Sequence, residues 1–201
     1  MKKLIAIFLL LFNIVNCGLI AQKTNEGVYL SVNDFMAGKT SYVDNHQTGK
    51  YKLCVNKLFC PATIKIIKGD SIIRLSKNSV FGYRDKRSNF YRFYKRITYK
   101  ILNPGEKILL YTSTAMAGVP KNIHLVTTWY FSENAGSPVY PLTRKNLKTV
   151  LYKEVALHTL LDVYFSSDNE LSASDLLNKK YMLNRVYDES KQTLCRINEN
   201  K

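Results

Sequence analysis

The chain has 201 residues and a formal net charge of +15 at pH 7, because 30 Lys and Arg residues outnumber 15 Asp and Glu residues. Hydrophobic residues make up 46% of the sequence, which excludes a disordered chain, and the length suits one domain with a sizeable core. A positive surface attracts nucleic acid, anionic lipid headgroups and acidic polymers alike, so the charge selects no partner by itself.

Residues 1–21 have the layout of a secretory signal peptide. Two lysines precede an apolar run over residues 4–20, and Ala21 is a small residue at a suitable cleavage position. The run is short for a membrane span, which needs about 20 predominantly apolar residues. We therefore expect an exported mature chain, residues 22–201, with a net charge of +13 and no transmembrane segment. Export to the periplasm or cell envelope argues against nucleic acid as the partner.

A lipoprotein signal is the alternative, because Cys17 lies near the end of the apolar run, where an acylated cysteine would be. Asn16 is bulkier than the small residue expected before such a cysteine. Residues 18–20 are apolar, whereas a lipid anchor usually has a polar tether at this place. Cleavage after Ala21 is therefore favoured, and a lipoprotein anchored at Cys17 remains the alternative.

Residues 27–140 are predicted to be rich in β-structure. Near their start, Ser31 or Asn33 can cap a short helical turn that Gly38 ends. Runs with a period of two then recur between polar turns, and a tight turn at residues 69–70 predicts a hairpin between two of them. The expected strands cover residues 51–59, 63–68, 71–75, 80–83, 90–94, 97–102, 107–112 and 125–131.

The segment 80–102 interleaves basic and aromatic residues, which suits either a half-buried hairpin or a platform for an anionic polymer. Its period of two, with turn residues at 85–89 and 103–105, favours a meander with aromatic cross-strand pairs. This interpretation predicts mainly buried side chains at Tyr91, Phe93, Ile97, Tyr99 and Ile101, and solvated ones at Lys86, Arg87, Lys95 and Lys100.

Helical periodicity begins at Thr143, which is a natural N-cap. Leu142 can pack on Leu147 at the spacing of a hydrophobic staple. Apolar residues then recur every three or four positions as far as Phe165, which predicts one amphipathic helix or two that join near Tyr152.

A further helix is expected over residues 172–189, so that the helical part covers 143–190 and residues 191–201 form a polar tail. Strands followed by helices, rather than alternating with them, are typical of α+β folds. The expected architecture is an antiparallel meander or partly open barrel followed by two or three C-terminal helices.

The sequence predicts no catalytic, cofactor-binding or metal-binding residue. No two of the histidines, His46, His124 and His158, have metal-ligand spacing. His158 and Asp162 lie four apart on a predicted helix and can touch, but two ligands are too few for zinc. The chain has no Gly-x-Ser-x-Gly elbow, phosphate-binding glycine loop or His-Glu-x-x-His motif. A catalytic site assembled from distant residues remains open, since triads need not be local in sequence.

Three cysteines remain in the mature chain, and cysteines outside the cytoplasm tend to pair. Cys54 and Cys60 flank the segment VNKLF, which is short enough for a loop-closing disulfide. The alternative is that both are buried hydrophobic residues. Cys195 is then the candidate for a free thiol.

Three parts of the chain carry a resemblance: GVYLSVNDFMAGK at 27–39, VFGYRD and FYRFY between 80 and 94, and LTRKNLKTVL, His158, LLDVYF and NEL between 142 and 171. In these parts the chain resembles a group of uncharacterised exported proteins from Bacteroidetes-type bacteria. The Ala21-Gln22 junction is similar to theirs too. The resemblance covers most of the mature chain; it implies an envelope location and brings no catalytic residue.

The sequence thus favours an exported envelope protein that acts as a non-enzymatic binding, interaction or structural module. Its partner would be an anionic envelope polymer or another envelope protein. The alternative is an exported enzyme that acts on cell-wall or glycan substrates. That alternative requires a deep pocket with at least two ionisable side chains within hydrogen-bonding reach.

Overall fold

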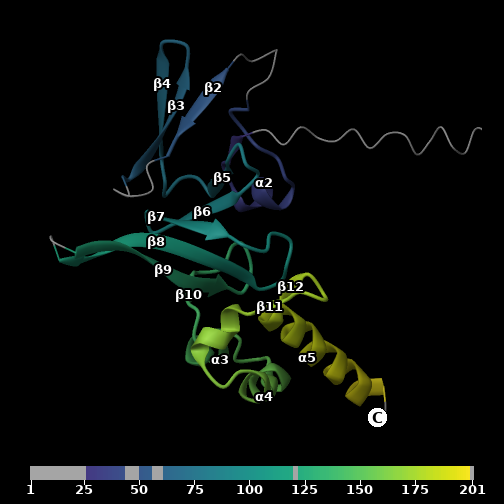
Figure 1. The fold of residues 1–201 in the computed structure, drawn as a ribbon. Coiled ribbons are helices and arrows are strands. Elements are labelled where there is room, and N and C mark those ends of the chain that lie inside the picture. The colour runs from purple at the N-terminus through teal and green to yellow at the C-terminus, as the bar shows by residue number, and fades with distance from the viewer. Residues whose placement is uncertain (1–25, 44–49, 56–60, 120–121, 200–201) are drawn as a thin grey trace, which may run out of the picture.

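The computed structural model describes residues 26–43, 50–55, 61–119 and 122–199, and its fold is α+β, as the order of strands and helices predicts. A seven-stranded antiparallel sheet, curled into a half-barrel, forms the centre (Figure 1). In the view of Figure 1 a smaller three-stranded sheet lies above the central sheet, and most helices lie below it.

The central sheet has the strand order β1-β5-β6-β7-β8-β9-β10. Its strands are β1 (Gly27–Tyr29), β5 (Gly82–Arg84), β6 (Phe90–Tyr94), β7 (Ile97–Ile101), β8 (Leu109–Val119), β9 (Asn122–Ser132) and β10 (Tyr140–Pro141). The small sheet contains β2 (Tyr51–Cys54), β3 (Thr63–Lys68) and β4 (Ser71–Ser76). The remaining elements are α2 (Val32–Met36), α3 (Arg144–Val150), α4 (Val155–Tyr164), η1 (Asp168–Ser172), β11 (Ser174–Asp175), β12 (Lys180–Tyr181) and α5 (Met182–Glu199).

Two hairpins show how the turns set the strand register. The predicted hairpin of β3 and β4 is confirmed, and Gly69 in its two-residue turn has a φ of +54°, a left-handed conformation that suits glycine. The hairpin of β6 and β7 turns at Lys95 and Arg96, whose φ angles of +48° and +69° are also left-handed. Two left-handed residues in succession are typical of the type I′ turn, which matches the twist of the flanking strands.

Each face of the central sheet carries a packed hydrophobic cluster over part of its area. On one face, Tyr91 and Phe93 pack against Ile64 and Ile66 of the small sheet, and further along the helices cover Leu110 and its neighbours. On the other face, α2 packs against a cluster that includes aromatic residues from several strands. This second cluster consists of Tyr29, Phe35, Phe81, Tyr99, Ile101, Leu109, Tyr111 and Ala135.

The predicted burial in the segment 80–102 is largely confirmed. Tyr91, Phe93, Tyr99 and Ile101 are buried, which the core interpretation requires. The prediction for Ile97 is wrong, because this side chain is 38% exposed. It begins β7 beside the hairpin turn, where only Tyr94 lies opposite. Among the basic residues expected in solvent, Lys86, Arg87 and Lys95 are exposed, whereas Lys100 is half-buried.

The start of the helical part follows the predicted signals. The Thr143 hydroxyl accepts a hydrogen bond from the Asn146 backbone N–H at 3.1 Å, so Thr143 caps α3. Leu142 and Leu147 are both buried in the core beneath the helices. The expected junction near Tyr152 is also present, since α3 ends at Val150 and α4 begins five residues later.

The predicted helix over 172–189 has wrong boundaries. Residues 174–181 form the β11–β12 hairpin, and α5 begins only at Met182. Asp175 accepts hydrogen bonds from the backbone and side chain of Asn178, a local arrangement that competes with a helix. The φ of Lys179 is +52°, which excludes an α-helix at this position. Helix α5 then runs to Glu199, so the expected tail over 191–201 is mostly helix.

Candidate functional site

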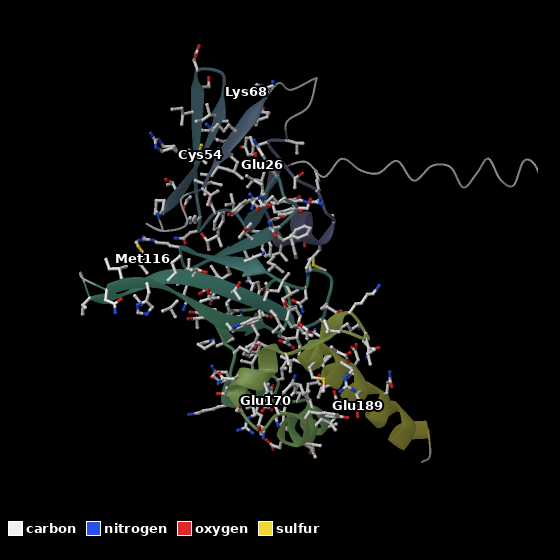
Figure 2. The ribbon with its side chains drawn as sticks, viewed as in Figure 1. Glu26, Cys54, Lys68, Met116, Glu170 and Glu189 are labelled. Atoms are coloured by element: carbon white, nitrogen blue, oxygen red, sulfur yellow. The ribbon has the colours of Figure 1, made fainter. Side chains whose placement is uncertain are left out.

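Strands β8 and β9 continue beyond the central sheet as a two-stranded arm, which we define as residues 113–119 and 122–128. The two strands pair without interruption from Leu109 and Ser132 to the tip. Strand β7 pairs with β8 only at Tyr111 and Thr112, and β10 pairs with β9 only at Tyr130 and Phe131, near the end of β9. Neither outer edge of the arm therefore pairs with any other strand among the described residues. Figure 1 shows the arm projecting away from the rest of the protein, and Figure 2 shows Met116 on it.

The arm exposes apolar side chains on both faces. Met116 and Leu125 are cross-strand partners on one face, and Ala115 and Val126 are partners on the other. His124 is the only ionisable residue among the described residues of the arm. A solvent-exposed edge strand usually carries charged residues, proline or a bulge that prevents pairing with another chain, and the described arm has none of these. Its large exposed apolar residues, between 39% and 66% accessible, are Met116, Val119, Ile123, Leu125 and Val126.

An open groove of about 460 Å³ lies between residues 102–106 and the β11–β12 hairpin. Among the described residues, those of this groove most resemble an active site, because ionisable groups lie close together there. Lys180 Nζ lies 3.7 Å from Glu106 Oε1 and 2.9 Å from Asp188 Oδ2. The hydrogen bond to Asp188, with the nearby Glu106, raises the pKa of Lys180 above its ordinary value. Hydrogen bonds from Asn178 lower the pKa of Asp175, which also pairs with Arg185 at 3.1 Å. Both groups therefore stay charged near neutral pH, whereas a general acid or base works best with a pKa near the operating pH.

The histidines are not brought together. The imidazole of His158 forms a hydrogen bond through Nε2 with the Leu151 carbonyl oxygen at 2.9 Å, and Asp162 instead forms an ion pair with Lys148 at 2.6 Å. His124 lies on the arm, and His46 is outside the described residues. Within the ranges that the structure describes, no cluster of three or more His, Cys, Asp or Glu residues could hold a metal ion.

The cysteine prediction is not tested. Cys54 ends β2 and is half-buried. Cys60 lies outside the described residues, and so does the side chain of Cys195. The Cys54–Cys60 disulfide therefore stays a prediction.

The guanidinium of Arg92, which is 4% exposed, is a buried charged group that was not predicted from the sequence. It donates hydrogen bonds to Tyr111 Oη at 3.0 Å, to Ser132 Oγ at 3.3 Å and to the Ser137 carbonyl oxygen at 2.8 Å. None of the described carboxylates pairs with it. Arg92 thus ties β6 to β8, β9 and the loop before β10, which is a structural role. A basic residue within a strand gives no sequence signal for such burial.

None of the described helices is both long enough and apolar enough to cross a membrane. The chain matches no protein-family model, no curated protein and no solved structure. Its function is therefore inferred from the features described above, of which the arm is the most distinctive.

Proposed function

We propose that the protein is an exported, non-enzymatic interaction module of the cell envelope that assembles through the arm. The observation that supports this proposal is the combination of two unpaired strand edges with apolar, uncharged faces. Unpaired edges of this kind readily accept a strand from another chain, because backbone hydrogen bonds supply affinity and the side chains on either face supply specificity.

The partner that best fits the arm is a second copy of this chain. Two molecules with a net charge of +15, or +13 after processing, repel each other over most of their surfaces. The described strands of the arm carry no Lys, Arg, Asp or Glu, so two molecules can meet there with little repulsion between charged side chains, and the projection of the arm keeps the two bodies apart. A twofold contact between identical arms is self-complementary, which is the commonest arrangement of soluble oligomers.

A lipid bilayer fits the arm less well. A two-stranded ribbon in hydrocarbon would leave the backbone groups of both outer edges without hydrogen bonds, which costs several kcal/mol for each group. A partner that supplies a strand satisfies these groups.

The test is sedimentation velocity of the purified mature chain over a wide range of concentrations. The parent is expected to associate, and Met116→Glu combined with Leu125→Lys is expected to be monomeric. This double substitution puts opposite charges on cross-strand partners, so it keeps the net charge and the stability of the arm. The control is Ile72→Glu combined with Leu176→Lys, which makes the same change at exposed apolar residues outside the arm and should associate like the parent.

A parent that stays monomeric at every concentration contradicts association with a second copy. Association that survives the arm substitutions contradicts the role of the arm. Photocrosslinking from Leu125 in the native host then separates the partners. A link to the same chain supports self-association, a link to a different protein shows a heterologous partner, and the absence of any link refutes the arm as an interaction site.

The exported location is part of the proposal, and it is supported by the N-terminal pattern and by the resemblance to exported proteins. We expect cleavage after Ala21, so that protein from the native host begins at Gln22. Intact-mass analysis measures this directly. A species that retains residues 1–21 would contradict export, and one that begins at a lipid-modified Cys17 would show the lipoprotein alternative.

A further inference from the structure

The face of the central sheet that carries the small sheet and the helices has an uncovered strip in its middle. Tyr91, Lys100 and Thr112 are register partners across β6, β7 and β8, so they form one row on this face. The small sheet covers the face beyond Tyr91, and the helices cover it beyond Leu110. A pocket of about 160 Å³ lies on this strip, and it is lined by residues of the central sheet alone: Tyr91, Thr98, Lys100, Thr112 and Thr114.

The pocket lining consists of one ammonium group and four hydroxyl groups, and it includes no carboxylate. Lys100 is half-buried, and among the described residues its ammonium has neither an ion pair nor a hydrogen-bond partner. The Thr112 hydroxyl likewise has no hydrogen-bond partner in the described part of the chain. A half-buried cation beside an uncommitted hydroxyl is a site that favours a negatively charged, oxygen-rich group.

A second cation contacts a residue that lines the pocket. Lys77 is 1% exposed, and its Nζ donates a hydrogen bond to Thr98 Oγ1 at 3.1 Å. Because an ammonium group can only donate, Thr98 Oγ1 must accept, which leaves the Thr98 hydroxyl hydrogen available to a ligand. The buried charge of Lys77 also adds to the positive potential of the pocket, since burial weakens its screening by salt.

The nearest carboxylate, Asp85, does not neutralise the pocket. Its oxygens accept hydrogen bonds from the backbone N–H groups of Arg87 and Asn89, from the Asn89 side chain and from the Tyr91 hydroxyl. Burial raises the pKa of Asp85, but these hydrogen bonds outweigh burial and hold the pKa below its ordinary value. Asp85 therefore remains ionised and is held by its own loop and by the Tyr91 hydroxyl, which is committed to it. Asp85 does not line the pocket, whereas Lys100 does.

We propose that this pocket binds a phosphate group, either as the free anion or as part of an anionic polymer. The available donors, Thr98, Lys100 and Thr112, come from the adjacent strands β7 and β8 and line the same pocket, which suits the several acceptor directions of a tetrahedral oxyanion better than a planar carboxylate. The site lies on the sheet rather than on the arm, so it does not depend on self-association. It gives the basic protein a defined contact for an anionic partner, beyond general attraction by charge.

Calorimetric titration of the purified mature chain at constant ionic strength tests the site. The two probes are inorganic phosphate and a polymer of glycerol linked by phosphodiesters. Lys100→Gln is expected to weaken binding by about tenfold or more, because hydrogen bonds to charged groups contribute about 1.5–3 kcal/mol. Thr112→Val, which keeps the shape of the side chain, should weaken it severalfold. Lys95→Gln is the matched control, since it removes the same charge at an exposed position near the pocket, and it should bind like the parent.

The two probes distinguish the sources of the phosphate group. Saturable, Lys100-dependent binding of inorganic phosphate supports a site for the free anion. The same dependence for the polymer alone supports a site for a polymer-borne phosphate. Equal losses in Lys100→Gln and Lys95→Gln would show diffuse charge attraction and overturn the proposal, as would the lack of saturable binding to both probes. Thermal unfolding of each variant checks folding, and if Lys100→Gln unfolds, the binding loss in Thr112→Val decides between the site and diffuse attraction.

Discussion

Phe93→Ala is expected to lower the free energy of unfolding by about 3–5 kcal/mol, the cost of removing a buried phenylalanine. The Phe93 side chain is 5% exposed and packs between the central and small sheets, where its ring lies 5.6 Å from that of Tyr83. The substitution would leave a cavity in this layer and remove the ring beneath the buried Lys77 ammonium, which lies 5.3 Å from the ring centre. Urea denaturation followed by circular dichroism measures the change.

The control for this prediction is charge reversal at the exposed residues Lys86 and Arg87. Lys86 forms only a long ion pair with Glu26, at 4.0 Å, so replacing both residues with Glu should change stability by less than about 0.5 kcal/mol. The two results together decide the role of the segment 80–102. If Phe93→Ala unfolds at the same urea concentration as the parent but loses binding to an anionic polymer, the aromatic residues form a binding platform rather than core.

Local signals in the sequence were sufficient for most of the fold. The period of two between turn residues predicted the hairpin of β3 and β4 and the meander from β5 to β9. The Thr143 cap and the Leu142–Leu147 pair predicted where the helical part begins. Each of these signals depends on residues that are close in sequence, and the geometry they favour is kept in the fold.

Features that depend on distant contacts could not be predicted in this way. The predicted strands 107–112 and 125–131 include only part of β8 and β9, so the extension of both strands to the tip of the arm was not predicted. Alternation predicts a face of a strand but does not show what covers it. The hairpin at residues 174–181 replaced a predicted helical turn because Asp175 bonds to Asn178 and Lys179 is left-handed. The phosphate pocket likewise requires the register of three strands, and Lys100, predicted to be solvated, is half-buried because of it.

The largest loss of stability is expected for Gly82→Ala, on the order of 4 kcal/mol or more, which is the range of the most damaging substitutions. A Cβ atom at Gly82 would lie 1.9 Å from the Tyr91 carbonyl oxygen, 2.9 Å from the Tyr91 carbonyl carbon and 3.0 Å from the Arg92 Cα atom. All three are backbone atoms, so no change of side-chain rotamer relieves the clash. Strand β5 must therefore move away from β6, which weakens their ladder and the packing of Tyr83 against Tyr91.

Urea denaturation and soluble yield measure this loss, with Gly136→Ala as the matched control. At Gly136 the nearest atom to an added Cβ is Asn134 Oδ1 at 3.4 Å, an ordinary contact with a side chain, so stability should change by less than about 0.5 kcal/mol. A Gly82→Ala variant within about 1 kcal/mol of the parent would mean that β5 and β6 are not held as closely as described. Because β5 joins β1 to the rest of the central sheet, such a result would also weaken the assignment of β1 to the edge of that sheet.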